Sequence, residues 1–116
     1  MLVLFKGIMQ HNFVKIVVFV PVSHADAVRE ALAEAGAGHI GNYDSCSFSS
    51  RGTGRFRGMQ GSKPFIGERG TLEEVSEERI ETLCPADNMG AIMEAVREAH
   101  PYEEPAIDIY PLLNEK

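Results

Sequence analysis

The 116-residue chain lacks tryptophan and contains only two cysteines, Cys46 and Cys84. Two cysteines do not form a disulfide framework at this length, and neither belongs to a CxxC pair that would indicate structural zinc. We therefore expect free thiols in a cytoplasmic protein. No apolar run approaches the roughly 18 residues that span a bilayer, and the first residues lack the features of a secretory signal. We expect residues 1–13 to be a poorly ordered N-terminal extension and residues 14–116 to form one domain.

Positive charge is also scarce, since 11 Lys and Arg stand against 17 Asp and Glu, giving a net charge of −6. Phosphate backbones are bound by clustered basic side chains, so this balance argues against a nucleic-acid partner. The densest basic group lies in a glycine-rich segment, where it is either a local anion site or part of a solvated loop. We favour the loop. The group comprises Arg51, Arg55, Arg57 and Lys63.

Hydrophobic periodicity predicts four strands and two helices. The β-branched run at 14–22 is typical of a buried central strand. Ser23 follows it as a candidate N-cap of a helix, which Gly36 and Gly38 end by permitting positive φ. The other predicted elements are strands at 42–50, 73–84 and 106–112, and a helix from Pro85 to Pro101.

Six glycines fall between Arg51 and Gly70, interleaved with Phe56 and Phe65. The segment is too long for a tight turn and too aromatic for a disordered linker. We expect an extended, curled hairpin, or an ordered loop that packs its two phenylalanines.

The order β-α-β-β-α-β predicts an α+β domain of the ferredoxin-like type. Right-handed crossovers place both helices on one face of the sheet. The other face is left without cover, so we expect the chain to associate with copies of itself through that face. The strand directions bring the His24 turn, the glycine-rich hairpin and the His100 turn to the same end of the sheet, with His39 at the opposite end.

The turn at 100–105 is rich in side chains that bind cations or carry charge. His100 and a carboxylate of Glu103 or Glu104 are candidate ligands for a divalent cation, with His24 joining them from the neighbouring turn. In the alternative that we favour, His100 is a cationic cap at the helix C-terminus, Tyr102 packs and the glutamates face solvent or another subunit. We expect Cys46 to be an unreactive thiol within a strand.

Several motifs, in the same order, resemble the YqfO-like family, whose members are similar to the domain inserted into Nif-three-like dinuclear-metal proteins. The last motif is also similar to the His-Pro-Tyr-Glu turn of CutA-like divalent-cation tolerance proteins. The resemblance implies a CutA/PII-like fold, assembled as a trimer, without the metal-binding core of the longer proteins. The motifs lie at residues 41–48, 52–56, 61–67 and 100–108.

In PII-like folds the hairpin region contacts ligands and partners, so the resemblance implies that Arg55, Arg57 and Lys63 meet an anionic small molecule. We favour the alternative that the hairpin closes a subunit interface, anchored by Phe56 and Phe65.

The resulting hypothesis is a non-catalytic homo-oligomeric module that binds a divalent cation or small ligand, or that serves as an assembly unit. We expect no nucleic-acid or membrane partner. The alternatives are a metal-dependent hydrolase of the Nif-three-like type acting at the His24/His100 end, and a PII-like adaptor that binds a partner through the hairpin.

Overall fold

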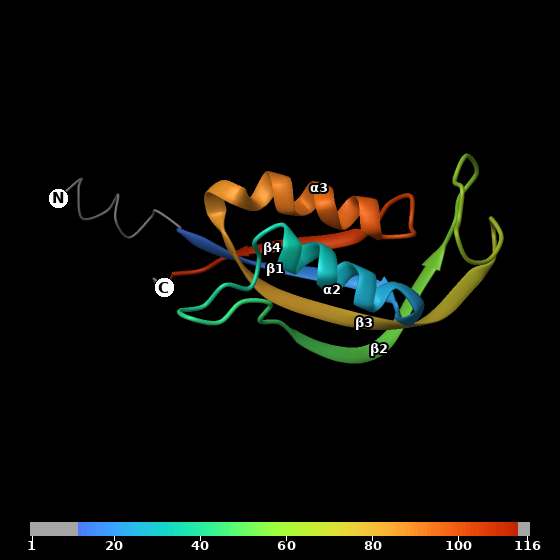
Figure 1. The fold of residues 1–116 in the computed structure, drawn as a ribbon. Helices are drawn as coiled ribbons and strands as arrows, with labels where there is room; N and C mark the ends of the chain where they lie inside the picture. Colours follow the sequence, from blue (N-terminus) through green and yellow to red (C-terminus); the bar gives the residue numbers. More distant parts are fainter. Residues whose placement is uncertain (1–11, 114–116) are drawn as a thin grey trace.

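The computed structural model describes residues 12–113. Its strands are β1 (Phe13–Pro21), β2 (Phe48–Arg57), β3 (Leu72–Pro85) and β4 (Ala106–Pro111). They pair antiparallel in the order β2-β3-β1-β4. The helices α2 (Ala25–Glu34) and α3 (Met89–Ala99) both cover one face of the sheet (Figure 1). The predicted ferredoxin-like α+β fold is therefore confirmed.

The core lies between the two helices and the face of the sheet that they cover. Ile16 and Val18 on β1 point into it, while Val28 of α2 and Ile92 of α3 meet them from above, and all four are fully buried. The alternate positions of β1, such as Val17, belong to the other face because side chains alternate along a strand. The buried cluster comprises Val14, Ile16, Val18, Val20, Ala25, Val28, Leu32, Ala37, Ile80, Cys84, Ile92 and Val96.

The ends of α2 differ in part from expectation. A 3₁₀ turn, η1 (Val22–His24), precedes the helix, so His24 rather than Ser23 is the N-cap, and the His24 side chain makes no capping hydrogen bond to the described residues of the helix. The Ser23 hydroxyl instead lies 2.8 Å from His24 Nδ1. At the C-terminus the prediction is confirmed, because Gly36 and Gly38 have φ of 105° and 80°. A Cβ at Gly38 would stand 2.5 Å from the Cys46 carbonyl oxygen, so that position also requires glycine for space.

The predicted strand at 42–50 is wrong, because β2 begins at Phe48 and continues through Gly52 and Gly54. The backbone of Cys46 is bound outside the sheet, where its N–H donates to the Gly38 carbonyl at 2.9 Å. The neighbouring Ser45 has a left-handed φ of 59°. Cys46 consequently lies in a connecting loop and is partly exposed, in contrast to the strand position predicted for it.

Beyond the body of the domain, β2 and β3 continue as a curled two-stranded hairpin (Figure 1). Its loop is closed where the Gly70 N–H donates to the Gly58 carbonyl at 2.8 Å. The predicted extended hairpin is confirmed. At the other end, Phe13 lies in β1 although the sequence placed it in the N-terminal extension; residues 1–11 of that extension lie outside the described residues. Within residues 12–113, no helix is long and apolar enough to cross a membrane.

Candidate functional site

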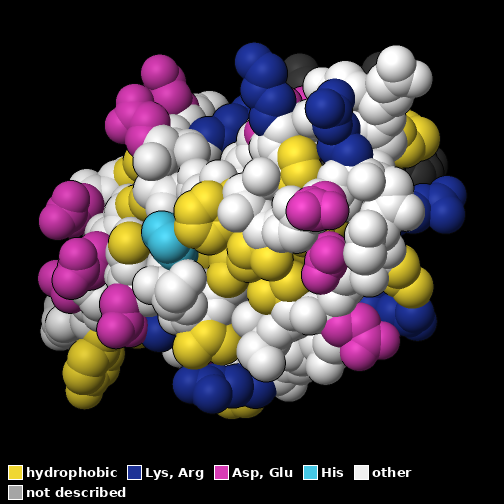
Figure 2. Space-filling model, turned by 90° about the vertical axis from the view of Figure 1, so that its right-hand side faces the viewer, with side chains coloured by type: hydrophobic (Ala, Val, Ile, Leu, Met, Phe, Trp, Pro, Cys, Tyr) yellow, Lys and Arg dark blue, Asp and Glu magenta, His cyan; other side chains and the backbone are white. Residues whose placement is uncertain are grey.

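Three segments that are distant in the sequence meet at the hairpin end of the molecule, as the strand directions predicted. The His24 ring packs edge-on against Phe65 at 5.4 Å between centroids, and Phe65 lies 6.4 Å from Tyr102. Tyr102 in turn contacts Phe56 of β2 at 5.7 Å and His100 at 5.0 Å. Figure 2 views this end face on, with hydrophobic side chains near the centre and charged side chains around them.

His100 is a buried, hydrogen-bonded residue with only 6% of its surface exposed. Its Nε2 lies 2.7 Å from the Phe19 carbonyl oxygen of β1, and the Tyr102 N–H donates to its Nδ1 at 3.2 Å. These partners require a neutral ring protonated on Nε2. Burial lowers the pKa of His100, against the opposing effects of the Phe19 carbonyl and Glu77. His100 is the C-cap residue of α3, as predicted. The cationic form predicted for it is wrong, because a desolvated imidazole resists protonation.

Tyr102 connects this cluster to a carboxylate that sequence reasoning missed. Its hydroxyl donates to Oε2 of Glu77, which is only 9% exposed, at 3.0 Å. Burial and the Glu77 contact raise the pKa of Tyr102, so the phenol stays protonated and remains a donor. Glu77 lies directly against Gly54, where a Cβ would overlap the carboxylate. The pairing of a strand glycine with a carboxylate is a tertiary feature, and Glu77 is otherwise one of several glutamates in β3.

The predicted cation ligands lie at this end, and three of the four are engaged in other contacts. Glu103 Oε1 accepts a hydrogen bond from the Lys63 backbone N–H at 2.8 Å, and Glu104 is exposed. His24 contacts Phe65, and both nitrogens of His100 have partners. Within residues 12–113, no group of three or more His, Cys, Asp or Glu side chains is arranged to hold a metal ion. Cation binding by these residues stays a prediction.

The predicted anion-binding residues are spread along the hairpin. Arg55 Nε lies 3.4 Å from Glu74, and Arg51 Nε lies 3.9 Å from Glu78. Arg57 and Lys63 are exposed, and neither forms an ion pair with another described residue. Anion binding by this group likewise stays a prediction.

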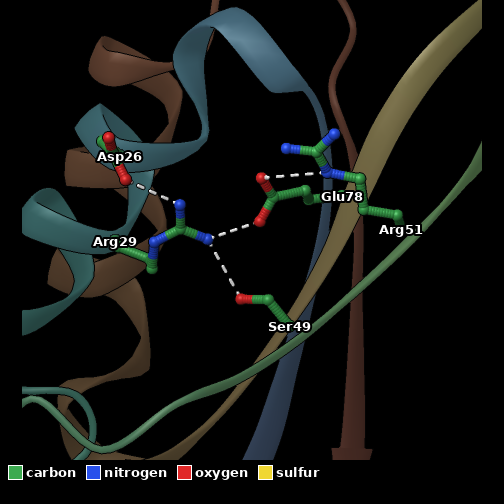
Figure 3. A network of polar contacts seen from close by, with 5 residues as sticks. All are labelled: Asp26, Arg29, Ser49, Arg51 and Glu78. Carbon is green, nitrogen blue, oxygen red and sulfur yellow. Dashed lines mark hydrogen bonds and ion pairs between the residues drawn. The ribbon is translucent and has the colours of Figure 1, made fainter.

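A second polar network joins α2 to the sheet and was not predicted (Figure 3). Arg29 Nη1 donates to Glu78 at 2.6 Å and to the Ser49 hydroxyl at 3.0 Å, while Nη2 donates to Asp26 at 2.7 Å. Hydrogen bonds to Asp26 and then Glu78 raise the pKa of Arg29 against the opposing effect of burial. Three of the five guanidinium donors thus serve the fold, and the network fixes α2 over β2 and β3.

A cavity of about 250 Å³ adjoins this network, between α2 and the loop before β2. Cys46 and Thr82 line it, and the Thr82 hydroxyl donates to the Cys46 carbonyl at 2.7 Å. The other cysteine, Cys84, is fully buried, and burial raises its pKa to about 11. The two thiols therefore differ strongly in their environments.

No family model matches the chain. Over 101 residues it is 55% identical to a protein of Halalkalibacterium halodurans named "GTP cyclohydrolase 1 type 2 homolog", covering 87% of this chain and 27% of that protein. A crystal structure of a Bacillus cereus protein related to NIF3 superposes with a TM-score of 0.78 at 53% identity, covering 90% of this chain and 26% of the other. The chain thus spans about a quarter of these relatives. CutA1 of Shewanella sp. SIB1 shares the fold, with a TM-score of 0.67 at 17% identity over 92% of this chain and 87% of that chain.

Proposed function

We propose that this chain, a homologue of one segment of the NIF3-related proteins, is a non-catalytic module that assembles with copies of itself, as a trimer, through the uncovered face of its sheet. The likeness to Nif-three-like proteins predicted from the motifs is confirmed for this segment, and the CutA likeness is confirmed for the fold. The activity of the longer relatives is not part of the proposal.

The observation that carries the proposal is the composition of the sheet face opposite the helices. One row across this face runs from Phe48 on β2 through Glu81 and Val17 to Asp108 on β4. Phe48 is 69% exposed at one side of the face, and Tyr110 is 44% exposed at the other. Large exposed aromatic side chains on a sheet face that neither described helix covers are typical of a protein interface.

The centre of this face is polar and partly shields itself. Glu81 lies 3.8 Å from Lys15 and 3.2 Å from Arg79, whose guanidinium also stands 5.7 Å from the centre of the Phe19 ring. Arg79 Nε is the atom that makes the 3.2 Å ion pair with Glu81, and it is buried within the chain. A central arginine flanked by aromatic residues is a composition that protein interfaces favour.

A hollow of about 370 Å³ lies at the end of the sheet away from the hairpin, and Lys15, Phe48, Leu83 and Leu112 are among its lining residues. A second copy packed on this face would deepen it. A small ligand held between copies is therefore compatible with the proposed assembly.

The ionisable side chains at the hairpin end also support a structural role for the chain. His100, Tyr102, Glu77 and Glu103 each bind another part of the chain, so their hydrogen bonds hold the fold together. This is the arrangement expected of a module with a structural role.

Light scattering of the purified chain at micromolar concentration tests the proposal, with a trimer as the expected result. Phe48→Glu and Tyr110→Glu place charge on the proposed interface and should dissociate the trimer while the circular dichroism spectrum is retained. Ala91→Glu, an exposed position on α3, is the matched control and should leave the trimer intact. A wild-type chain that remains a single subunit at this concentration would overturn the proposal.

A further inference from the structure

The distal hairpin, defined here as residues 54–75, is separate from the core of the domain. The buried core cluster of the described residues contains no member of this segment. Residues 54–57 pair with 72–75 in the ladder, and the loop closes on itself through Gly58 and Gly70. A hairpin outside the core is only marginally stable by itself, so its position depends on side-chain contacts with the body.

These contacts converge on the turn at residues 100–105. Phe56 and Phe65 of the distal hairpin both pack against the Tyr102 ring, at 5.7 and 6.4 Å. The Lys63 N–H donates to Glu103 at 2.8 Å. A further contact, between Phe65 and His24 at 5.4 Å, reaches η1.

Tyr102 is itself fixed to two strands of the body. Its hydroxyl donates to Glu77 of β3 at 3.0 Å, and its N–H donates to His100 at 3.2 Å. His100 Nε2 is bonded in turn to the Phe19 carbonyl of β1 at 2.7 Å. A continuous set of hydrogen bonds thus runs from β1 to β3 through the residue on which the hairpin packs.

We propose that the turn at residues 100–105 is a clasp, in which Tyr102 and Glu103 hold the distal hairpin against the body and can release it without unfolding the core. Release would reorient the exposed Met59 and the basic side chains of Arg57 and Lys63, which lie on the hairpin. The surface that the hairpin offers to other molecules is therefore set by a turn that is far away in the sequence.

Hydrogen–deuterium exchange on the full chain tests the clasp. Tyr102→Ala removes both ring contacts with the hairpin, the ring contact with His100 and the hydrogen bond to Glu77. Exchange in the distal hairpin should therefore quicken about tenfold or more, while α3 and β1 remain protected. Tyr102→Phe keeps the ring and should give a smaller increase, and Glu103→Ala should affect mainly the loop around Lys63. Tyr43→Ala, at a residue that is 74% exposed at the opposite end, is the matched control and should change nothing in the hairpin.

Unchanged hairpin exchange in both Tyr102→Phe and Glu103→Ala would overturn the proposal, as would an increase that appears equally in β1 and α3. These two variants decide the matter even where Tyr102→Ala fails to fold. Light scattering on each sample fixes the assembly size, so loss of self-association is recognised separately from release of the hairpin.

Discussion

Replacing Arg29 with methionine tests whether the network of Figure 3 stabilises the fold. Glu78 is a buried carboxylate, and its side chain is only 11% exposed. After the substitution, the remaining cationic partner of Glu78 within residues 12–113 is Arg51, at 3.9 Å. The Ser49 hydroxyl also loses its hydrogen bond from Arg29. The methionine keeps most of the apolar stem of arginine, so the change isolates the charge.

The expected cost follows from burial. Removing one partner of a fully buried ion pair costs about 3–5 kcal/mol, because the other charge is left uncompensated. The Arg29 side chain is 30% exposed, and solvent screening therefore lowers our expectation to about 2 kcal/mol. Urea unfolding with a slope of about 1–2 kcal/mol per M would then show a midpoint lower by about 1–2 M.

Two further variants make the assay decisive. Asp26→Asn removes a contact to the same guanidinium, but Asp26 is 94% exposed, so the loss should stay below about 0.5 kcal/mol. Adding Glu78→Gln to Arg29→Met removes the uncompensated carboxylate charge and should restore about 1 kcal/mol or more of the free energy of unfolding. Protein concentration is held fixed because association contributes to apparent stability. If Arg29→Met costs less than Asp26→Asn, or if Glu78→Gln adds its full cost to that of Arg29→Met, the reasoning is refuted.

Four further outcomes are expected. Gly38→Ala should lower the free energy of unfolding by more than about 1 kcal/mol, measured in urea, because of its φ of 80° and the nearby Cys46 carbonyl. Ellman's reagent should modify one thiol of the native chain, Cys46, and a second only in denaturant, because Cys84 is buried with a pKa of about 11. Because folding lowers the pKa of His100, the unfolded chain protonates this imidazole at a higher pH than the folded chain does. The free energy of unfolding should therefore decline below about pH 6.5, and His100→Gln should make that decline less steep. Zinc should raise the melting temperature by less than about 1 °C, since a metal must displace a hydrogen bond of His100; a larger rise that His100→Ala abolishes would contradict this.

Most of the fold could be predicted because long segments with a strong hydrophobic pattern indicate their secondary structure locally. The strands predicted at 14–22 and 106–112 match β1 and β4 to within a residue at each end. The strand at 42–50 was misplaced because polar and apolar residues alternate there, which imitates a strand. Gly52 and Gly54 then appeared to belong to a loop, since glycine is depleted in strands. Glycine is required at position 54 because a Cβ there would overlap the Glu77 carboxylate. The local sequence gives no sign of that contact.

In the candidate site, too, the arrangement of the segments could be predicted, but the contacts between individual side chains could not. Topology alone brought His24, the hairpin and His100 to one end, because strand directions follow from the order of the elements. Arg29 and Glu78 could not be paired from the sequence, since they are 49 positions apart and each resembles an ordinary surface charge. Only the position of α2 over β3 buries the carboxylate and so makes the pair important.

His100 shows why the residue types of a turn do not determine its chemistry. The following Pro101 favours an extended backbone, and His100 accordingly leaves the helix at φ −83° and ψ 135°. A ligand and a structural histidine have the same sequence environment here; what separates them is which atoms face the two ring nitrogens. In this fold those atoms are the Phe19 carbonyl, supplied by β1, and the Tyr102 N–H. Phe19 lies 81 positions before His100, so the pairing of the sheet determines whether this imidazole is a structural bridge or is available as a metal ligand. A change at Phe19 that shifted its carbonyl would free the imidazole.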